Sequence, residues 1–118
     1  MRRLILLIAF LLISSASFAD NSQRKISSGA ITESQSIKSS AGTVYGLYVE
    51  ATAANGYAVI VDYAGSTIAD LPSYNELVEA REATQFNSKF VNIEEDGIKA
   101  YNGIYLYLQN ATAVVYYY

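Results

Sequence analysis

The stretch that most constrains the fold is residues 39–62, SSAGTVYGLYVEATAANGYAVIVD, in which two alternating apolar segments flank an asparagine–glycine pair. Successive side chains of a strand point to opposite sides, and residues 43–52 are partly apolar on both, which is typical of a central strand. Asn55-Gly56 accepts the positive φ angles of a type I′ turn. The stretch therefore predicts a β-hairpin, with residues 57–63 as the partner strand of residues 43–52.

The same alternation recurs at the end of the chain, where residues 104–109 and 112–118 flank Asn110-Ala111. If this pair is a two-residue turn, Ile104, Leu106 and Leu108 form a core face with Ala113, Val115 and Tyr117. A slip of one residue would exchange the two faces. Six to eight short strands at this spacing predict an all-β fold, an antiparallel β-sandwich or jelly roll.

Two segments depart from this pattern. Residues 26–38 are rich in Ser and Thr, with isolated isoleucines, and predict one or two edge strands. Ser73 to Glu76 follows Pro72 with the spacing of a capping box, so one short helix of about two turns is expected to continue to Ala83. An irregular loop would need the same residues, and that alternative stays open.

The beginning of the chain predicts export. A basic start with Arg2 and Arg3, an apolar run over residues 4–13 and the small-x-small site Ser17-Phe18-Ala19 are typical of a secretory signal peptide. The alternative is an uncleaved membrane anchor, although the run is shorter than the roughly 20 residues that span a bilayer. We expect a signal peptide at residues 1–19, a polar N-terminal segment or edge strand at 20–38 and a β-sandwich domain at 39–118. The mature protein would be secreted, periplasmic or bound to the cell surface, with no membrane contact after cleavage near Ala19.

The charge and the missing residue types narrow the functions. Loss of Arg2 and Arg3 would leave six basic against 11 acidic residues, a formal charge of −5, which argues against nucleic acid as a partner. Without histidine or cysteine, the usual triads, zinc sites and most common general base are absent. A carboxylate pair among Glu50, Asp62, Asp70 and residues 94–96 is conceivable, but strand ends and a solvated turn suit these residues better. We therefore expect no enzyme, no cofactor and no bound metal.

Eleven tyrosines without a tryptophan are the unusual feature of the composition. Tyrosine suits strands, and it is also enriched at interfaces because its rigid ring is both apolar and polar. In the expected terminal hairpin, four tyrosines form an exposed stripe on one face. This stripe is the candidate interaction site, fitting a protein contact or a sugar-stacking platform: Tyr105, Tyr107, Tyr116 and Tyr118.

Residues 37–62 also carry a resemblance, through Ile37-Lys38, Ala41-Gly42, the run VYGLYV at 44–49 and VIVD at 59–62. Together with residues 102–106 and the Val/Tyr-rich last strand, they resemble small β-sandwich virion structural or decoration proteins of tailed bacteriophages. The resemblance implies a capsid-decorating or structural module without catalytic residues. The expected signal peptide and the segment at 73–83 depart from that group. A second, weaker similarity is to pilus subunits, through Tyr117 and Gly103.

The sequence thus favours an exported, non-enzymatic, self-assembling or surface-decorating β-sandwich, as part of an extracellular filament, a surface layer or a virion. Its partners would be copies of itself or another surface or virion protein, bound through sheet edges and the tyrosine-rich face. The alternative is a secreted carbohydrate- or receptor-binding module. If residues 20–38 can leave their own sheet, donor-strand assembly follows. If they are paired within their own domain, a monomeric binder is favoured.

Overall fold

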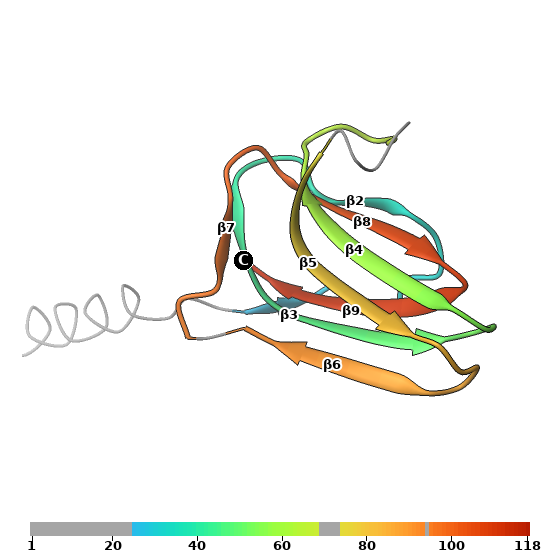
Figure 1. Ribbon diagram of the computed structural model, residues 1–118. Coiled ribbons are helices and arrows are strands. Elements are labelled where there is room, and N and C mark those ends of the chain that lie inside the picture. The colour runs from blue at the N-terminus through green and yellow to red at the C-terminus, as the bar shows by residue number, and fades with distance from the viewer. Residues whose placement is uncertain (1–24, 69–73, 94) are drawn as a thin grey trace, which may run out of the picture.

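The computed structural model describes residues 25–68, 74–93 and 95–118, and this part of the chain is all-β, with two antiparallel sheets and no helix (Figure 1). The expected signal peptide and its cleavage site lie outside the described residues. One sheet has the order β1-β9-β3-β6, with β7 also beside β3, and the other has the order β2-β8-β4-β5. The strands are β1 (Ile26–Ser27), β2 (Gln35–Lys38), β3 (Gly42–Ala51), β4 (Gly56–Asp62), β5 (Asn75–Glu82), β6 (Ser88–Asn92), β7 (Ile98–Ala100), β8 (Ile104–Gln109) and β9 (Ala111–Tyr117).

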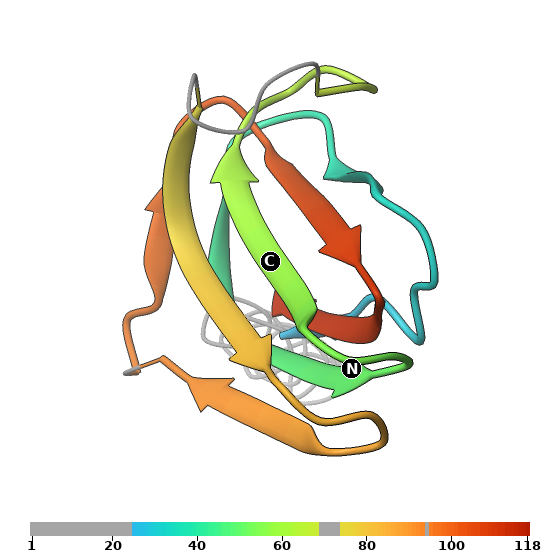
Figure 2. The ribbon, with the colours of Figure 1, turned by 45° about the vertical axis from the view of Figure 1, so that its right-hand side comes forward.

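The two tight turns join the sheets instead of closing hairpins. β3 pairs with β6, β7 and β9, whereas β4 pairs with β5 and β8. The expected hairpins of β3 with β4 and of β8 with β9 are therefore wrong, because each chain segment crosses from one sheet to the other at its turn (Figure 2). Asn55 and Asn110 have the expected positive φ angles, 60° and 51°, but Gly56 does not, so the expected type I′ turn at Asn55-Gly56 is wrong. A positive φ angle reverses the chain equally well within a sheet or between sheets.

Of the six crossings between the sheets in the described part of the chain, the four that we call arches connect β1 to β2, β3 to β4, β5 to β6 and β8 to β9. Each arch has one residue with positive φ: Gly29, Asn55, Phe86 and Asn110. Hydrogen bonds join neighbouring arches, from the Asn55 N–H to the Ala83 carbonyl at 3.0 Å and from the Asn110 side-chain amide to the Ala54 carbonyl at 3.3 Å. The arches are thus stacked in the same order as the strands, and they close one end of the sandwich.

The core lies between the sheets and contains the face that the sequence predicts. Ile104 and Leu106 of β8 face Ala113 and Val115 of β9 within one cluster, although the two strands do not pair. The apolar alternation therefore assigned each side chain to the correct face, even though the expected neighbour was wrong. β3 is a central strand, as predicted, with Leu47 and other residues fully buried.

The expected short helix after Pro72 is wrong in the described part, where residues 75–82 form β5 instead. Ser73, the first residue of the expected capping box, and the preceding Pro72 lie outside the described residues. Along β5 the burial alternates: Val78 and Ala80 are buried against β4, while Glu79 and Arg81 are exposed. The seven-residue strand β4 offers a full ladder of hydrogen-bonding groups on that side, and pairing with it overrides the local helical preference.

The polar segment at residues 26–38 supplies two edge strands, as predicted, one for each sheet. β1 pairs with the end of β9, and β2 pairs with β8. Between them, Ile31 is buried and exchanges two backbone hydrogen bonds with Ala113, at 2.8 and 2.9 Å. The described part of this segment is paired within its own domain. Because this pairing was expected to favour a monomeric binder, it argues against donor-strand exchange by residues 26–38.

Candidate interaction surface

The four tyrosines of the expected stripe do not form one surface. Tyr105 and Tyr107 lie on the outer face of the β2-β8-β4-β5 sheet, whereas Tyr116 lies on the outer face of the other sheet. Tyr118 is at the end of the chain, with the Lys38 ammonium 5.6 Å from its ring centroid. The stripe is wrong because β8 and β9 belong to different sheets, so their outward faces point in opposite directions.

The tyrosines on the outer face of the β2-β8-β4-β5 sheet form a second small core. Val59 and Val61 point outward from β4 but are fully buried, and Tyr105 is only 4% exposed. Tyrosine rings cover these valines and pack edge to face, with centroids 5.9 Å apart for Tyr63 and Tyr105. We call Tyr57, Tyr63, Tyr74, Tyr105 and Tyr107 the tyrosine cluster. Rings packed in this way stabilise the sheet and offer little flat surface for a partner.

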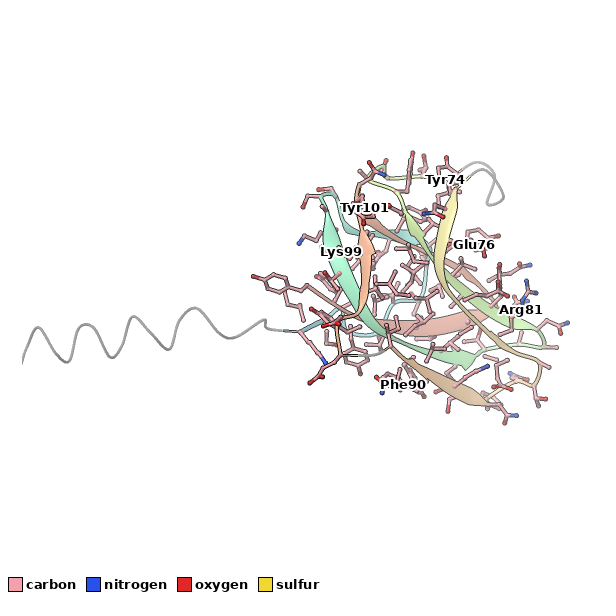
Figure 3. All side chains as sticks on the ribbon, turned by 60° about the vertical axis from the view of Figure 1, so that its left-hand side comes forward. Tyr74, Glu76, Arg81, Phe90, Lys99 and Tyr101 are labelled. Atoms are coloured by element: carbon pink, nitrogen blue, oxygen red, sulfur yellow. The ribbon has the colours of Figure 1, made fainter. Side chains whose placement is uncertain are left out.

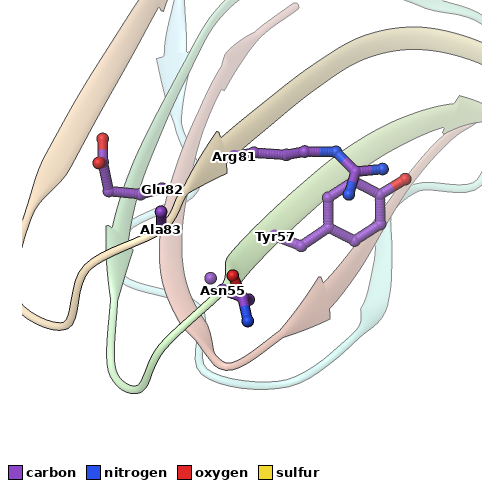
Figure 4. A pocket seen from close by; sticks show the side chains of 6 residues that line it. Asn55, Tyr57, Arg81, Glu82 and Ala83 are labelled. Carbon is purple, nitrogen blue, oxygen red and sulfur yellow. The ribbon is translucent and has the colours of Figure 1, made fainter.

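One side of the tyrosine cluster is also covered by an arginine. The Arg81 guanidinium lies over the Tyr57 ring, 4.2 Å from its centroid (Figure 4). It also bonds the Glu79 carboxylate. The hydrogen bond to Glu79 raises the pKa of Arg81. The pKa of Tyr57 is also raised, mainly by burial and secondarily by the negative charge of Glu79. The depression beside them has a volume of about 150 Å³, below the roughly 300 Å³ of ordinary ligand sites. Arg81 therefore occupies the ring face that a sugar would need.

The exposed aromatic surface lies instead on β6 and the arch before it. Phe90 is 52% exposed at the surface (Figure 3). Its ring nevertheless packs edge to face on Tyr116, with centroids 5.8 Å apart. Gly46 lies beneath this ring, since a Cβ at that position would come within 3.1 Å of Phe90 Cζ. The Phe90 ring is thus held in place by β3 and β9 while half of it faces solvent.

Phe86 is the second exposed phenylalanine and has a strained backbone. Its side chain is 74% exposed, and its φ of 70° is in the left-handed region, which disfavours bulky residues. A bulky exposed side chain in this conformation lowers stability relative to glycine, by about 1–2 kcal/mol. Strained, exposed residues of this kind are found at functional sites. In the sequence Phe86 is flanked by polar residues, which is a signal of exposure, whereas Phe90 precedes Val91 and carries no such signal.

β6 is also an open sheet edge. In the described part of the chain it pairs with β3 alone, and Figure 1 shows no strand beyond it. The other edge strands differ: β1 has two residues, β7 has three and β2 has four, while β5 carries Glu76, Glu79 and Glu82. Short strands and charged side chains are the usual protections of an edge. β6 has five residues, one charge at Lys89 and an exposed phenylalanine at its centre.

At the opposite end of the sandwich from the arches, Asp62 organises a turn. Its carboxylate accepts backbone N–H groups of Tyr101, Asn102 and Gly103 at 3.0, 2.8 and 3.2 Å. Burial raises the pKa of the Asp62 carboxyl, but these hydrogen bonds outweigh it and hold the pKa below its ordinary value. The turn presents Tyr101, which is 75% exposed, beside Lys99 (Figure 3).

Among the described carboxylates that the sequence offered for hydrolysis, Glu50 and Asp62 lie on different strands of different sheets. Asp62 is the last residue of β4, and Glu50, near the end of β3, accepts the Tyr48 hydroxyl at 3.3 Å. Both therefore lie at strand ends, as predicted. Asp70 and Glu94 lie outside the described residues. Within the described part of the chain, no group of three or more possible ligands is arranged to hold a metal ion.

These features define an all-β protein of two antiparallel sheets with one open, aromatic edge. No protein-family model, curated protein or solved structure matches the chain. Among the residues that the structure describes, none belongs to a helix of the length and apolarity required to cross a membrane.

Proposed function

We propose that this protein is an exported, non-enzymatic structural subunit that assembles through the open edge at β6. The single observation that carries the proposal is the combination of an unpaired edge strand with two exposed phenylalanines, Phe86 at 74% and Phe90 at 52%. An edge strand presents a row of unpaired backbone groups to another chain, and burial of an aromatic ring adds free energy to the pairing.

Phe86 supports the same proposal from a different direction. It is exposed in a conformation that glycine would adopt without strain, so its side chain contributes nothing evident to the fold. Together with the basic and apolar start of the chain, this fits a subunit used outside the cytoplasm. A filament, a surface layer and a virion surface are all assemblies that such an edge can serve.

The test is the mass of the protein as it is purified from cells that express the full chain. Light scattering over a range of concentrations, with negative-stain imaging, should show a defined oligomer or ordered assemblies, and intact mass would show whether the chain is cut after Ala19. Phe90→Lys places a charge at the centre of the edge and should return the protein to the mass of one chain. The control is Tyr101→Ser, which removes an equally exposed aromatic from another surface and should leave assembly unchanged. A single chain at every concentration, or unchanged assembly of Phe90→Lys, would overturn the proposal.

A carbohydrate-binding module is the second candidate, and Tyr101 is the observation that favours it. Its exposed ring borders a depression of about 340 Å³, together with Lys99, Gly42 and Thr43. The Asp62 carboxylate fixes the turn that carries this ring, so the platform is pre-organised. In this case Tyr101→Ser should abolish binding in a glycan screen and leave the mass unchanged, whereas Phe90→Lys should bind as the wild type does.

A further inference from the structure

The direction of the free backbone groups of β6 follows from its pairing with β3. The Ala51 N–H bonds the Asn87 carbonyl at 3.0 Å, and the Ile93 N–H bonds the Tyr45 carbonyl at 3.1 Å. In an antiparallel ladder, hydrogen-bonded and non-hydrogen-bonded positions alternate. The backbone N–H and C=O groups of Ser88, Phe90 and Asn92 therefore point away from β3, toward any strand that adds to this edge.

We propose that the partner at this edge is a second copy of the same chain, with the two β6 strands antiparallel and Phe90 opposite Phe90. This inference rests on the proposed function and deepens it by naming the partner and the register. In this arrangement Ser88 of each copy lies opposite Asn92 of the other, and all five residues of β6 are paired. The two sheets become one continuous sheet with a two-fold axis at its centre, the usual symmetry of a homodimer.

The side chains of β6 disfavour one of the two neighbouring registers. With the register shifted by one pair, so that Ser88 lies opposite Phe90, Lys89 of one copy would lie directly opposite Lys89 of the other, which is destabilising. With Phe90 opposite Phe90, each Lys89 lies opposite Val91 instead. A lysine in the middle of an edge strand ordinarily keeps edges apart. In β6, the position of Lys89 is compatible with Phe90 opposite Phe90, and it disfavours the register in which Lys89 lies opposite Lys89.

Charge and aromatic contacts favour the same partner. Lys89 is the single charged residue of β6, whereas the edge strand β5 carries three glutamates and Arg81. A joint between two β5 strands would therefore bring together two strands of net negative charge. On the outer face the two Phe90 rings meet at the axis. Each already packs on Tyr116, so a row of four aromatic rings would cross the joint.

The test uses the absence of cysteine from the chain, which makes introduced thiols unambiguous. Ser88→Cys and Asn92→Cys replace exposed residues whose Cα atoms would lie about 5.5 Å apart across the joint, within the range that a disulfide bridges. Each full-length variant is incubated alone and then mixed with the other, with oxidised glutathione as the oxidant. The mixture should give a disulfide-linked dimer on a non-reducing gel. Either variant alone should not, because its own thiols would be about 13 Å apart along the strand.

Lys89→Cys is the register control and should give no linked dimer on its own. A linked dimer of Lys89→Cys alone, or none from the mixture in a protein that light scattering shows to be associated, would overturn the register and leave the proposed function standing. A protein that remains one chain at every concentration would overturn both. Linkage in the expected mixture, lost when Phe90→Lys is added to both variants, would support both.

Discussion

The two lateral sides of the sandwich differ in whether the backbone groups at their sheet edges are covered. On one side, residues 26–38 cover the edges of β9 and β8. Beyond the paired residues of β1 and β2, serine hydroxyls accept backbone N–H groups of β9 and β8. The Ser28 hydroxyl accepts the Val115 N–H, and the Ser34 hydroxyl accepts the Leu108 N–H, both at 2.8 Å. On the other side, β6 presents its outward backbone groups and Phe90 without cover in the described part of the chain.

This difference shows that an open edge is not a general property of the fold. A two-residue strand and a four-residue strand are enough to close the first side, because side chains complete the hydrogen bonding that the backbone leaves unmade. The chain could protect the second side by the same means, yet it places an exposed phenylalanine there. The open side is therefore the one to examine for a partner.

The largest expected effect is on the closed side. Ile31→Ala removes a side chain that is 4% exposed and should lower the free energy of unfolding by about 3 kcal/mol, measured by urea denaturation. The matched change on the open side, Phe90→Ala, should lower it by less than about 1 kcal/mol, because half of that ring is already in solvent. Equal losses at the two positions would contradict the comparison.

Asp62→Asn should destabilise the fold without altering either side, and so serves as a control for global stability. The loss should be about 2 kcal/mol at pH 7, since a carboxylate that accepts three backbone N–H groups is replaced by a neutral amide. The folded pKa of Asp62 is lowered, so its contribution is fully present above the unfolded pKa of about 3.9 and disappears as the pH falls through the folded value. Unfolding midpoints of wild type and variant should therefore converge between about pH 4 and pH 2. A constant difference down to the lowest pH would show that the carboxylate charge is not involved.

The sequence predicted which face of a strand each side chain occupies, but it did not predict which strands pair. The period-two alternation correctly assigned Leu106, Ala113 and Val115 to the core, because facing depends only on local pleating. The sequence did not reveal which strands pair, because Asn55-Gly56 and Asn110 reverse the chain equally well within or between sheets. Pairing is decided by distant partners such as β9 for β3, and no local pattern encodes that choice.

The same limit explains the errors at the candidate site. The tyrosine stripe was expected from a β8–β9 hairpin. Because β8 and β9 lie in different sheets, the outward-pointing tyrosines of these strands lie on opposite faces of the molecule. The expected helix at residues 73–83 failed in its described part because the free side of β4 requires a partner strand. Phe86 was visible in the sequence as a lone apolar residue among polar ones, whereas Phe90 precedes Val91. The exposure of both depends on β6 lying at an edge.

Ser34→Ala tests whether side-chain hydrogen bonds close the first side. The change leaves the Leu108 N–H without its 2.8 Å acceptor and should lower the free energy of unfolding by about 1.5 kcal/mol. Hydrogen exchange should become faster at the Leu108 amide and unchanged at the amides of β6. A control is Ser88→Ala on the open side, where no side-chain hydrogen bond is lost within the chain described, and stability should change by less than about 0.5 kcal/mol. Unchanged exchange at Leu108 in the first variant would show that β2 itself closes the edge.

Phe86→Gly has the smallest expected effect on the fold, and that effect is of opposite sign. Glycine adopts the φ of 70° without the strain that a Cβ causes, so the variant should gain about 1 kcal/mol in the free energy of unfolding. If the open side serves assembly, the same variant should associate more weakly, because it loses a side chain that is 74% exposed. Phe86→Asn is the matched control, since asparagine also tolerates this conformation but keeps a side chain of moderate size. Stability and association measured on both variants separate relief of strain from loss of the ring. A gain in stability with undiminished association would remove Phe86 from the interface and leave Phe90 as its centre.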